Sequence, residues 1–141
     1  MYAAVRVRGY IGTEKSVRDT LSMLRLERVN HCVLIPNTPV MKGMVTKVKD
    51  YVTWGEIDKT TLEKLVEKRG RLPGDKKLDP TKAKSVVKLI EKEESVKNVE
   101  IKPVFRLSPP SKGYKTVRMP YPKGDLGYRG DKINPLLKRM I

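Results

Sequence analysis

Residues 20–52, TLSMLRLERVNHCVLIPNTPVMKGMVTKVKDYV, decide the fold of this chain. Their apolar side chains fall into three groups, spaced as in a helix, then a strand, then a helix again: Leu21, Leu24 and Leu26, then Val33 and Ile35, then Met41, Met44, Val45 and Val48. This change of period predicts a helix, a strand and a second helix. Thr38 and Pro39 mark the start of the second helix, because the threonine oxygen caps free amides and proline fits the first helical position.

One further strand is predicted on each side of this stretch. In AAVRVR, residues 3–8, valines alternate with Arg6 and Arg8, so one face suits a core and the other presents two guanidinium groups. YVTWGEI, residues 51–57, is the third strand. Residues 1–57 therefore predict a β-α-β-α-β core of the α+β class, with two helices on one face of the sheet. Periodicity alone does not give the order of the strands.

The character of the sequence changes after this core. Residues 58–101 contain two more apolar helical patterns around a loop rich in glycine, proline and charge, which predicts a helical appendage. Residues 102–141 begin with five prolines and one glycine between Pro103 and Pro122, which predicts an extended arm. A terminal helix capped by Asp131 or Asn134 is expected to end the arm.

Charge is the dominant feature of the composition. The chain has 31 Lys and Arg against 16 Asp and Glu, a formal net charge of +15, and one sign this strong implies a polyanionic partner. Residues 102–141 alone carry ten basic against two acidic side chains. No apolar run approaches the roughly 18 residues of a membrane span, and no signal sequence opens the chain. We therefore expect RNA rather than a membrane as the partner, and a cytoplasmic location, which the single cysteine fits.

Basic side chains and tyrosines alternate along the arm, where cations can neutralise phosphates and rings can stack on unpaired bases. The alternative is that the tyrosines, including Tyr121 and Tyr128, pin the arm to its own domain while the charges are simply solvated. The candidate RNA-binding residues come from the first strand, the second helix and the arm: Arg6, Arg8, Lys42, Lys47, Lys49, Arg106, Lys112, Tyr114, Lys115, Arg118, Lys123, Arg129, Lys138 and Arg139.

Catalytic and metal chemistry find little support in the sequence. His31 and Cys32 are neighbours on a strand, so their side chains point to opposite faces and form no nucleophile–base pair. They are expected to be a half-buried histidine and a buried cysteine. With no other His or Cys, one subunit cannot build a zinc-type site, and no catalytic residue, cofactor or small-molecule substrate is expected. GYIG, residues 9–12, resembles the phosphate loop of acylphosphatases, but Ile11 replaces the characteristic glutamine.

The core stretch resembles the large-subunit ribosomal protein L-thirty family. LRLERVNHCVLIPNTPVMKGMVTKV, residues 24–48, matches the family's helix, strand and "D/N-T-P…RGM…KV" segment, with Lys42 where arginine is common. YVTWGE, RLSPPSKGYK and GDLGYRGDKINPLLKRMI resemble segments of the archaeal and eukaryotic long form. The resemblance covers nearly the whole chain and is weakest over residues 71–100.

The resemblance implies a three-stranded antiparallel sheet of order 3-1-2 backed by two helices, somewhat like half a ferredoxin-like fold. It also implies a non-catalytic role in holding large-subunit ribosomal RNA and neighbouring ribosomal proteins. Lys42 with Gly43, residues 109–113 and Arg129 become the stronger candidates for contact. We hypothesise that the core docks on a preformed RNA fold and that the arm orders only on binding. A free-standing DNA-architectural protein and, less so, an acylphosphatase-like enzyme remain as alternatives.

Overall fold

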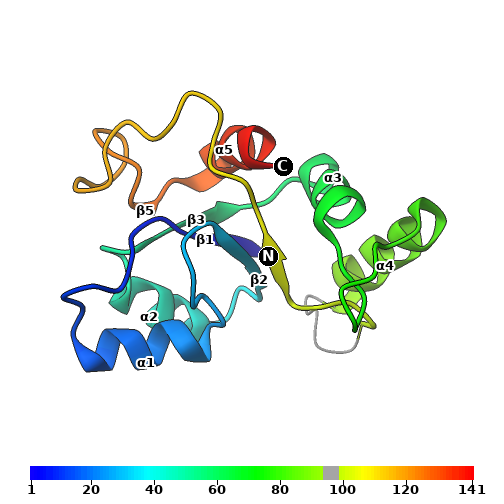
Figure 1. The fold of residues 1–141 in the computed structure, drawn as a ribbon, viewed down its shortest axis with the longest axis horizontal. Coiled ribbons are helices and arrows are strands. Elements are labelled where there is room, and N and C mark those ends of the chain that lie inside the picture. Colours follow the sequence, from blue (N-terminus) through cyan, green and yellow to red (C-terminus); the bar gives the residue numbers. More distant parts are fainter. Residues whose placement is uncertain (94–98) are drawn as a thin grey trace.

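A computed structural model, which describes residues 1–93 and 99–141, has a five-stranded mixed sheet with helices on both faces (Figure 1). The strand order is β4-β2-β1-β3-β5. The three central strands are antiparallel and keep the expected order, with β1 between β2 and β3. Their bounds are Tyr2–Arg6 for β1, His31–Ile35 for β2 and Val52–Glu56 for β3.

Two short strands extend the sheet, so the prediction of a three-stranded antiparallel sheet is wrong. β4 (Val104–Arg106) pairs antiparallel with β2, and β5 (Gly127–Tyr128) pairs parallel with β3. Both come from the segment predicted to be an extended arm. Strands of three and two residues are too short to show an alternating pattern, so they carry no strand signal of their own. In the structure they cover the edges that β2 and β3 would otherwise leave unpaired.

The first face of the sheet carries α1 (Lys15–Met23) and α2 (Pro39–Lys47). The predicted start of α2 is confirmed, because Met41 N donates to Thr38 Oγ1 over 3.3 Å and Pro39 is the first helical residue. The helices bury one side of each central strand in what we call the first cluster. Its members are Tyr2, Ala4, Leu21, Leu24, Leu26, Val33, Ile35, Val45, Val48 and Val52.

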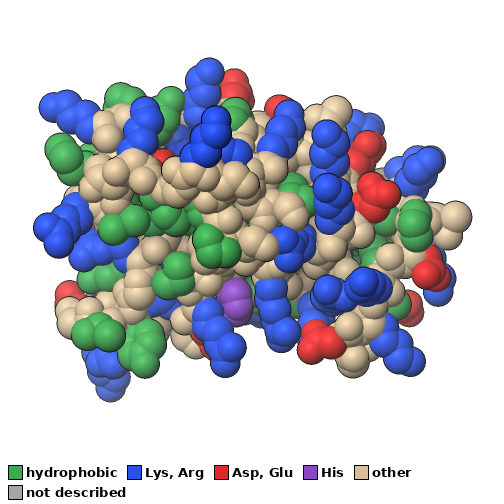
Figure 2. All heavy atoms as spheres, turned by 45° about the horizontal axis from the view of Figure 1, so that its top comes forward, with side chains coloured by type: hydrophobic (Ala, Val, Ile, Leu, Met, Phe, Trp, Pro, Cys, Tyr) green, Lys and Arg blue, Asp and Glu red, His purple; other side chains and the backbone are tan. Residues whose placement is uncertain are grey.

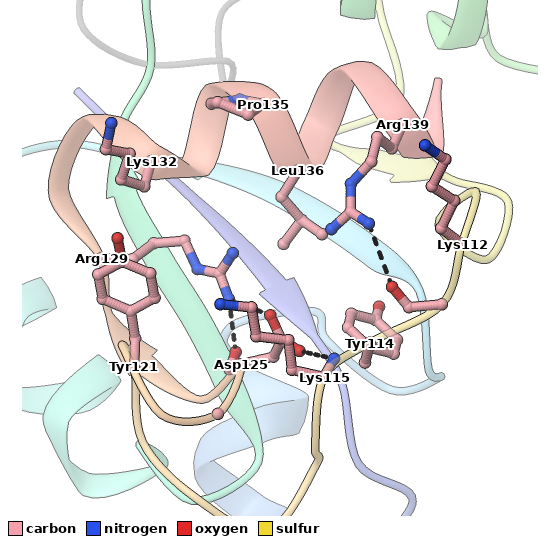
Figure 3. Close-up of a pocket in the computed structure, with 12 residues that line it drawn as sticks. Lys112, Tyr114, Lys115, Tyr121, Asp125, Arg129, Lys132, Pro135, Leu136 and Arg139 are labelled. Atoms are coloured by element: carbon pink, nitrogen blue, oxygen red, sulfur yellow. Dashed lines mark hydrogen bonds and ion pairs between the residues drawn. The ribbon is translucent and has the colours of Figure 1, made fainter.

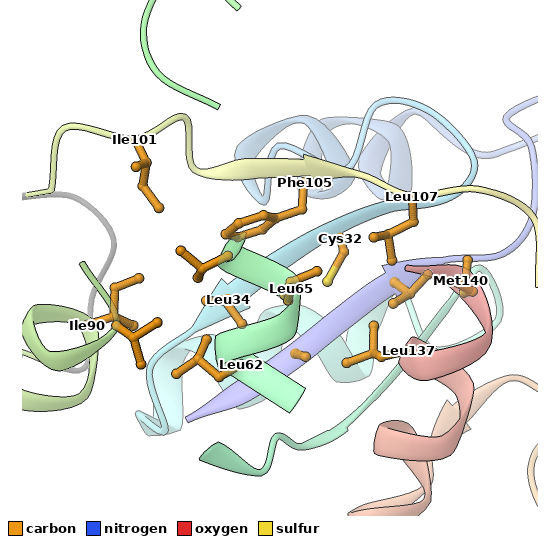
Figure 4. Close-up of a cluster of buried hydrophobic side chains, with 14 of the residues drawn as sticks. Cys32, Leu34, Leu62, Leu65, Ile90, Ile101, Phe105, Leu107, Leu137 and Met140 are labelled. Atoms are coloured by element: carbon orange, nitrogen blue, oxygen red, sulfur yellow. The ribbon is translucent and has the colours of Figure 1, made fainter. Parts of the chain in front are cut away.

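The second face is covered as well, by α3 (Lys59–Arg69) and α5 (Ile133–Met140), with α4 (Pro80–Glu93) packed against α3. The predicted exposed basic face of β1 is therefore wrong, since all five residues of β1 are buried. Figure 4 shows the second cluster, which combines sheet residues with residues from far along the chain. It includes Ala3, Val5, Cys32, Leu34, Leu62, Leu65, Ile90, Phe105, Leu137 and Met140.

Polar contacts fix α5 against the end of β3. Asn134 accepts a hydrogen bond from Asp58 N (2.9 Å) and donates one to Glu56 O (3.0 Å), so it does not cap its own helix. A Cβ at Gly55 would lie 2.0 Å from the Gly130 carbonyl oxygen, which shows how closely the two backbones approach. The 3₁₀ helix η1 (Gly130–Lys132) leads directly into α5.

The division into segments 1–57, 58–101 and 102–141 stays a prediction, although all three contribute described residues to the second cluster. Residues 94–98 of the middle segment lie outside the described residues. Among the helices that the structure describes, none is long and apolar enough to cross a membrane.

Candidate nucleic-acid interface

A hollow of about 420 Å³ lies between the segment 112–125 and the helix α5 (Figure 3). We call it the C-terminal hollow. Five basic side chains line it, three from loops of the predicted arm and two from η1 and α5, and its walls are completed by aromatic and apolar residues. The lining residues are Lys112, Gly113, Tyr114, Lys115, Tyr121, Gly124, Asp125, Arg129, Lys132, Pro135, Leu136 and Arg139.

A buried ion pair forms one wall of the C-terminal hollow. Arg129 Nη2 donates to Asp125 Oδ1 over 2.8 Å, and both side chains are buried. Arg129 Nε also donates to Thr53 Oγ1 (2.9 Å), while Asp125 accepts from the backbone N–H of Lys115. The guanidinium carbon lies 5.2 Å from the centre of the Tyr121 ring. Arg129 is thus consumed by internal contacts that tie the segment to β3, and it is a structural residue rather than a free contact for RNA.

Arg139 shapes the opposite rim. From α5 its Nη1 donates to the carbonyl oxygens of Ser111 (3.0 Å) and Gly113 (3.2 Å). The turn between them is sharp, with positive φ at Lys112 (67°) and Gly113 (68°). Glycine adopts this conformation at little cost, whereas lysine adopts it less readily. Arg139 therefore holds a turn that presents the exposed Lys112 at the edge of the hollow.

Arg6 points into the protein, contrary to the prediction that it faces RNA. Its Nη1 donates to the carbonyl oxygens of Leu26 and Glu27, each over 2.7 Å, and its Nε donates to Arg8 O over 2.9 Å. Only 2% of the residue is exposed, and burial lowers the pKa of Arg6. Arg6 donates to backbone carbonyls between α1 and β2, and its Nη2, which has no partner among the described residues, is itself buried, so Arg6 presents no exposed donor to a partner.

The other predicted residues lie at or near the surface but not in one place. Arg8 is half-buried, with its guanidinium carbon 5.2 Å from the Tyr51 ring centre. Tyr114 is also half-buried and donates to Asn30 Oδ1 over 3.1 Å, so this tyrosine does pin the segment to its own domain. The C-terminal hollow gathers only Lys112, Tyr114, Lys115, Arg129 and Arg139 from the predicted set. The exposed residues outside it are Lys42, Lys47, Lys49, Arg106, Arg118, Lys123 and Lys138.

Lys132 and Tyr121 belong to the hollow but are absent from the predicted set. Lys132 sits in η1, directly before the terminal helix, and its place in the charged run GDK is the available signal. The partners of Arg129 are beyond prediction, because Thr53 lies 76 positions earlier in the chain.

His31 and Cys32 have the predicted burial. Cys32 is fully buried, and burial raises the pKa of its thiol to about 12. Burial lowers the pKa of His31, and nearby Arg106 and Arg28 lower it further. Within residues 1–93 and 99–141, no group of three or more His, Cys, Asp or Glu side chains could hold a metal ion.

Basic side chains project from many places on the face drawn in Figure 2, mostly toward its rim. Acidic side chains gather mainly on the right of that view, at the end where Figure 1 places α3 and α4. There a second hollow, of about 360 Å³, has three lysines and three glutamates around Ala83 and Val87. On this face, positive and negative side chains are therefore mixed near α3 and α4.

Comparison with known proteins gives one consistent result. Residues 2–52 match the family model described as ribosomal protein L30p/L7e. Proteins named large ribosomal subunit protein uL30 match over the whole length. The one from Methanococcus maripaludis is 51% identical, with 99% of each chain covered. Those from Methanosphaera stadtmanae and Archaeoglobus fulgidus are 44% and 45% identical, with 100% and 99% of each chain covered. The relatives matched over the whole length, together with the family model, show that this chain belongs to the ribosomal protein L30p/L7e family.

Proposed function

We propose that this chain is a non-catalytic structural constituent of the large ribosomal subunit, located in the cytoplasm, and that it holds large-subunit ribosomal RNA at the C-terminal hollow. The relatives are named as proteins of that subunit. The observation that supports the RNA contact is the convergence of three lysines, Lys112, Lys115 and Lys132, on one hollow, since Arg129 and Arg139 are engaged in internal contacts. Its single acid, Asp125, is already paired with Arg129 and does not oppose an incoming phosphate.

The geometry supports backbone recognition rather than base reading. Lys112, Lys115 and Lys132 carry flexible ammonium groups, which suit phosphate oxygens in several orientations. Arg139 is already engaged with the turn at Ser111 and Gly113, so it positions Lys112 more than it binds. We infer that the hollow clamps the sugar–phosphate backbone of a folded RNA segment.

Neighbouring ribosomal proteins are proposed as partners of the α3–α4 side. Its hollow balances three lysines against three glutamates, and Lys59 Nζ lies 3.1 Å from Glu91 Oε2 across it. A neutral, mixed surface with an apolar floor offers little to a polyanion and more to another protein. This division assigns RNA and protein contacts to different ends of the molecule.

The test is a binding titration with protein-free large-subunit RNA at several salt concentrations. A triple variant, Lys112→Ala, Lys115→Ala and Lys132→Ala, removes three cations from the C-terminal hollow. Because each lost phosphate contact reduces the salt slope by about 0.7 to 0.9, the slope is expected to fall by about two and the affinity by at least about tenfold. Deleting residues 106–141 is unsuitable, since it also removes the buried Leu137 and Met140.

A matched control replaces Lys64, Lys68 and Lys82, exposed residues of α3 and α4, by alanine. It removes the same charge from the other end of the molecule and should change slope and affinity far less. Equal losses in both triple variants would contradict a defined site. Equal affinity for duplex DNA and large-subunit RNA at the same salt would instead favour the DNA-architectural alternative.

A further inference from the structure

Tyr128 is an exposed aromatic side chain that the rest of the fold holds in place. It lies on β5 at the edge of the sheet, directly opposite Trp54 of β3 (Figure 1). Its side chain is not part of the C-terminal hollow. The residue is 52% exposed, although tyrosine on a strand is usually packed against neighbours on at least one side.

Three contacts fix the ring. The hydroxyl donates to Glu56 Oε1 over 2.6 Å. The ring meets Tyr2 edge-on, with centroids 6.5 Å apart and an interplanar angle of 87°, and it lies 6.2 Å from Trp54 at 49°. A free tyrosine loses side-chain freedom when a ligand packs on it, but this one has already lost that freedom in the free protein.

Tyr10 is a second exposed tyrosine, but its ring is not held in place as that of Tyr128 is. It is 60% exposed in the loop after β1, and no ring contact or side-chain hydrogen bond is found for it among the described residues. Scattered exposed apolar residues of this kind are normal on protein surfaces. The ring of Tyr128 differs from that of Tyr10, because a hydrogen bond and two other rings fix its orientation before any partner binds.

The charges beside Tyr128 favour a planar, neutral partner over a phosphate. Glu56 accepts a hydrogen bond from the Tyr128 hydroxyl. This hydrogen bond is the main cause that raises the pKa of Tyr128 to about 12, so the side chain stays neutral. Asp131 adds a second negative charge nearby. Lys42 Nζ lies 5.8 Å from the centre of the neighbouring Tyr2 ring. A phosphate would meet the two carboxylates, whereas the face of a nucleobase would meet an oriented ring.

We propose that Tyr128 is a stacking platform for one unpaired base of the bound RNA. This inference rests on the proposed RNA-binding function and adds a second contact of different chemistry, at the β5 edge rather than in the C-terminal hollow. Stacking on an aromatic side chain tolerates any base and depends little on salt, unlike a lysine–phosphate contact. Loss of the ring should therefore weaken binding without changing the salt slope.

The first experiment compares Tyr128→Leu, Tyr128→Phe and the control Tyr10→Leu in titrations with protein-free large-subunit RNA. Since stacking is worth about 1–3 kcal/mol per base, Tyr128→Leu should weaken binding by about 5- to 150-fold at an unchanged salt slope. Tyr128→Phe keeps the ring and should stay close to the wild type, as should Tyr10→Leu. Wild-type affinity in Tyr128→Leu, or an equal loss in Tyr10→Leu, would overturn the platform.

The second experiment needs no variant, so it stands even if Tyr128→Leu folds poorly. Hydroxyl-radical oxidation of the wild-type protein is compared with and without the same RNA, and mass spectrometry reads each tyrosine. Tyr128 should become protected, and an undiminished oxidation rate in the RNA complex would overturn the proposal. If the wild type fails to bind large-subunit RNA at all, the proposed function fails instead, which separates the two conclusions.

Discussion

The two faces of the sheet are closed in different ways. On the first face, α1 and α2 come from residues 15–47; α1 connects the neighbouring strands β1 and β2, and α2 connects β2 to β3 on the other side of β1. On the second face, α3, α4 and α5 follow the three central strands and return to them from as far as residue 140. The family model matches residues 2–52, which include all of the first face and little of the second. The first face is thus closed by local sequence, and the second by long-range contacts that must be held in place.

Polar clamps provide that hold. Arg129, Asp125 and Thr53 join β5 to β3, and Asn134 joins α5 to the backbone at Glu56 and Asp58. Arg6 and Arg129 were both predicted to contact RNA, and both are buried. Arg6 makes a polar clamp like that of Arg129, because it joins β1 to the loop after α1.

The largest expected effect comes from breaking the buried pair on the second face. Asp125→Ala leaves Arg129 buried without its counter-ion, which should lower the free energy of unfolding by about 3–5 kcal/mol. Denaturant unfolding measures the loss. The control is Asp75→Ala, whose partners Lys102 and Arg106 are solvent-exposed to a third or more, so its loss should be far smaller than that of Asp125→Ala.

A double variant, Asp125→Ala with Arg129→Leu, removes both the Asp125 carboxylate and the buried guanidinium charge of Arg129. It should be more stable than Asp125→Ala alone, because much of the single variant's loss comes from the unpaired guanidinium. Equal stability of the single and double variants would mean that water reaches Arg129. The second face would then be held by apolar packing rather than by the clamp.

Substitutions at two glycines, one on each face of the sheet, should change the free energy of unfolding by smaller amounts and in opposite directions. Gly43 lies in α2 on the first face, and nothing lies within 4 Å of the position that an added methyl group would occupy, so Gly43→Ala should stabilise the protein by about 0.5–1 kcal/mol. Gly55→Ala on β3 should destabilise it by about 1–3 kcal/mol or more, because the new Cβ would lie 2.0 Å from the Gly130 carbonyl oxygen. Thermal unfolding of both variants gives the signs directly. A Gly55→Ala variant at least as stable as the wild type would contradict the close approach of η1 to β3.

The sequence predicted the first face well because its signals are local. Thr38 and Pro39 start α2, and the alternation at Val33 and Ile35 marks β2. The predicted strands and helices of residues 1–57 all exist, and the order of the central strands came from the family resemblance. Each of the local inferences needed only neighbours within a few positions, which is the range over which periodicity and capping act.

The second face could not be predicted in the same way. β5 has two residues and pairs with a strand more than 70 positions earlier, so its own sequence carries no strand signal. The burial of Arg6 depended on which side of β1 the helices α1 and α2 would cover: Val5 lies on the second face, whereas Arg6 follows Tyr2 and Ala4 on the first face and donates to the carbonyls after α1. Lys112, Lys115 and Lys132 meet at one hollow only because the chain folds back between them. Candidate cations were therefore predictable as a class, but not their division into clamps and contacts.

The smallest expected effect is a pH dependence at the boundary between the two regions. His31 of β2 pairs with Arg106 of β4, and it is the only histidine of the chain. Burial is the main cause that lowers the pKa of His31; Arg106, Arg28 and Arg6 lower it too, while Glu27 opposes them. The unfolded chain, with a histidine pKa of about 6.5, then binds a proton more readily than the folded protein does.

Because the unfolded state takes up more protons in this range, the free energy of unfolding should fall as pH drops through about 6.5. Unfolding in denaturant at pH 6.0 and pH 7.5 measures the change, in a window above the titration of ordinary carboxylates. His31→Gln should remove most of the dependence, and Arg106→Gln should reduce it. If Arg106→Gln leaves the pH dependence of the wild type intact, β4 contributes no charge to His31, and the coupling between the two regions is carried by backbone pairing alone.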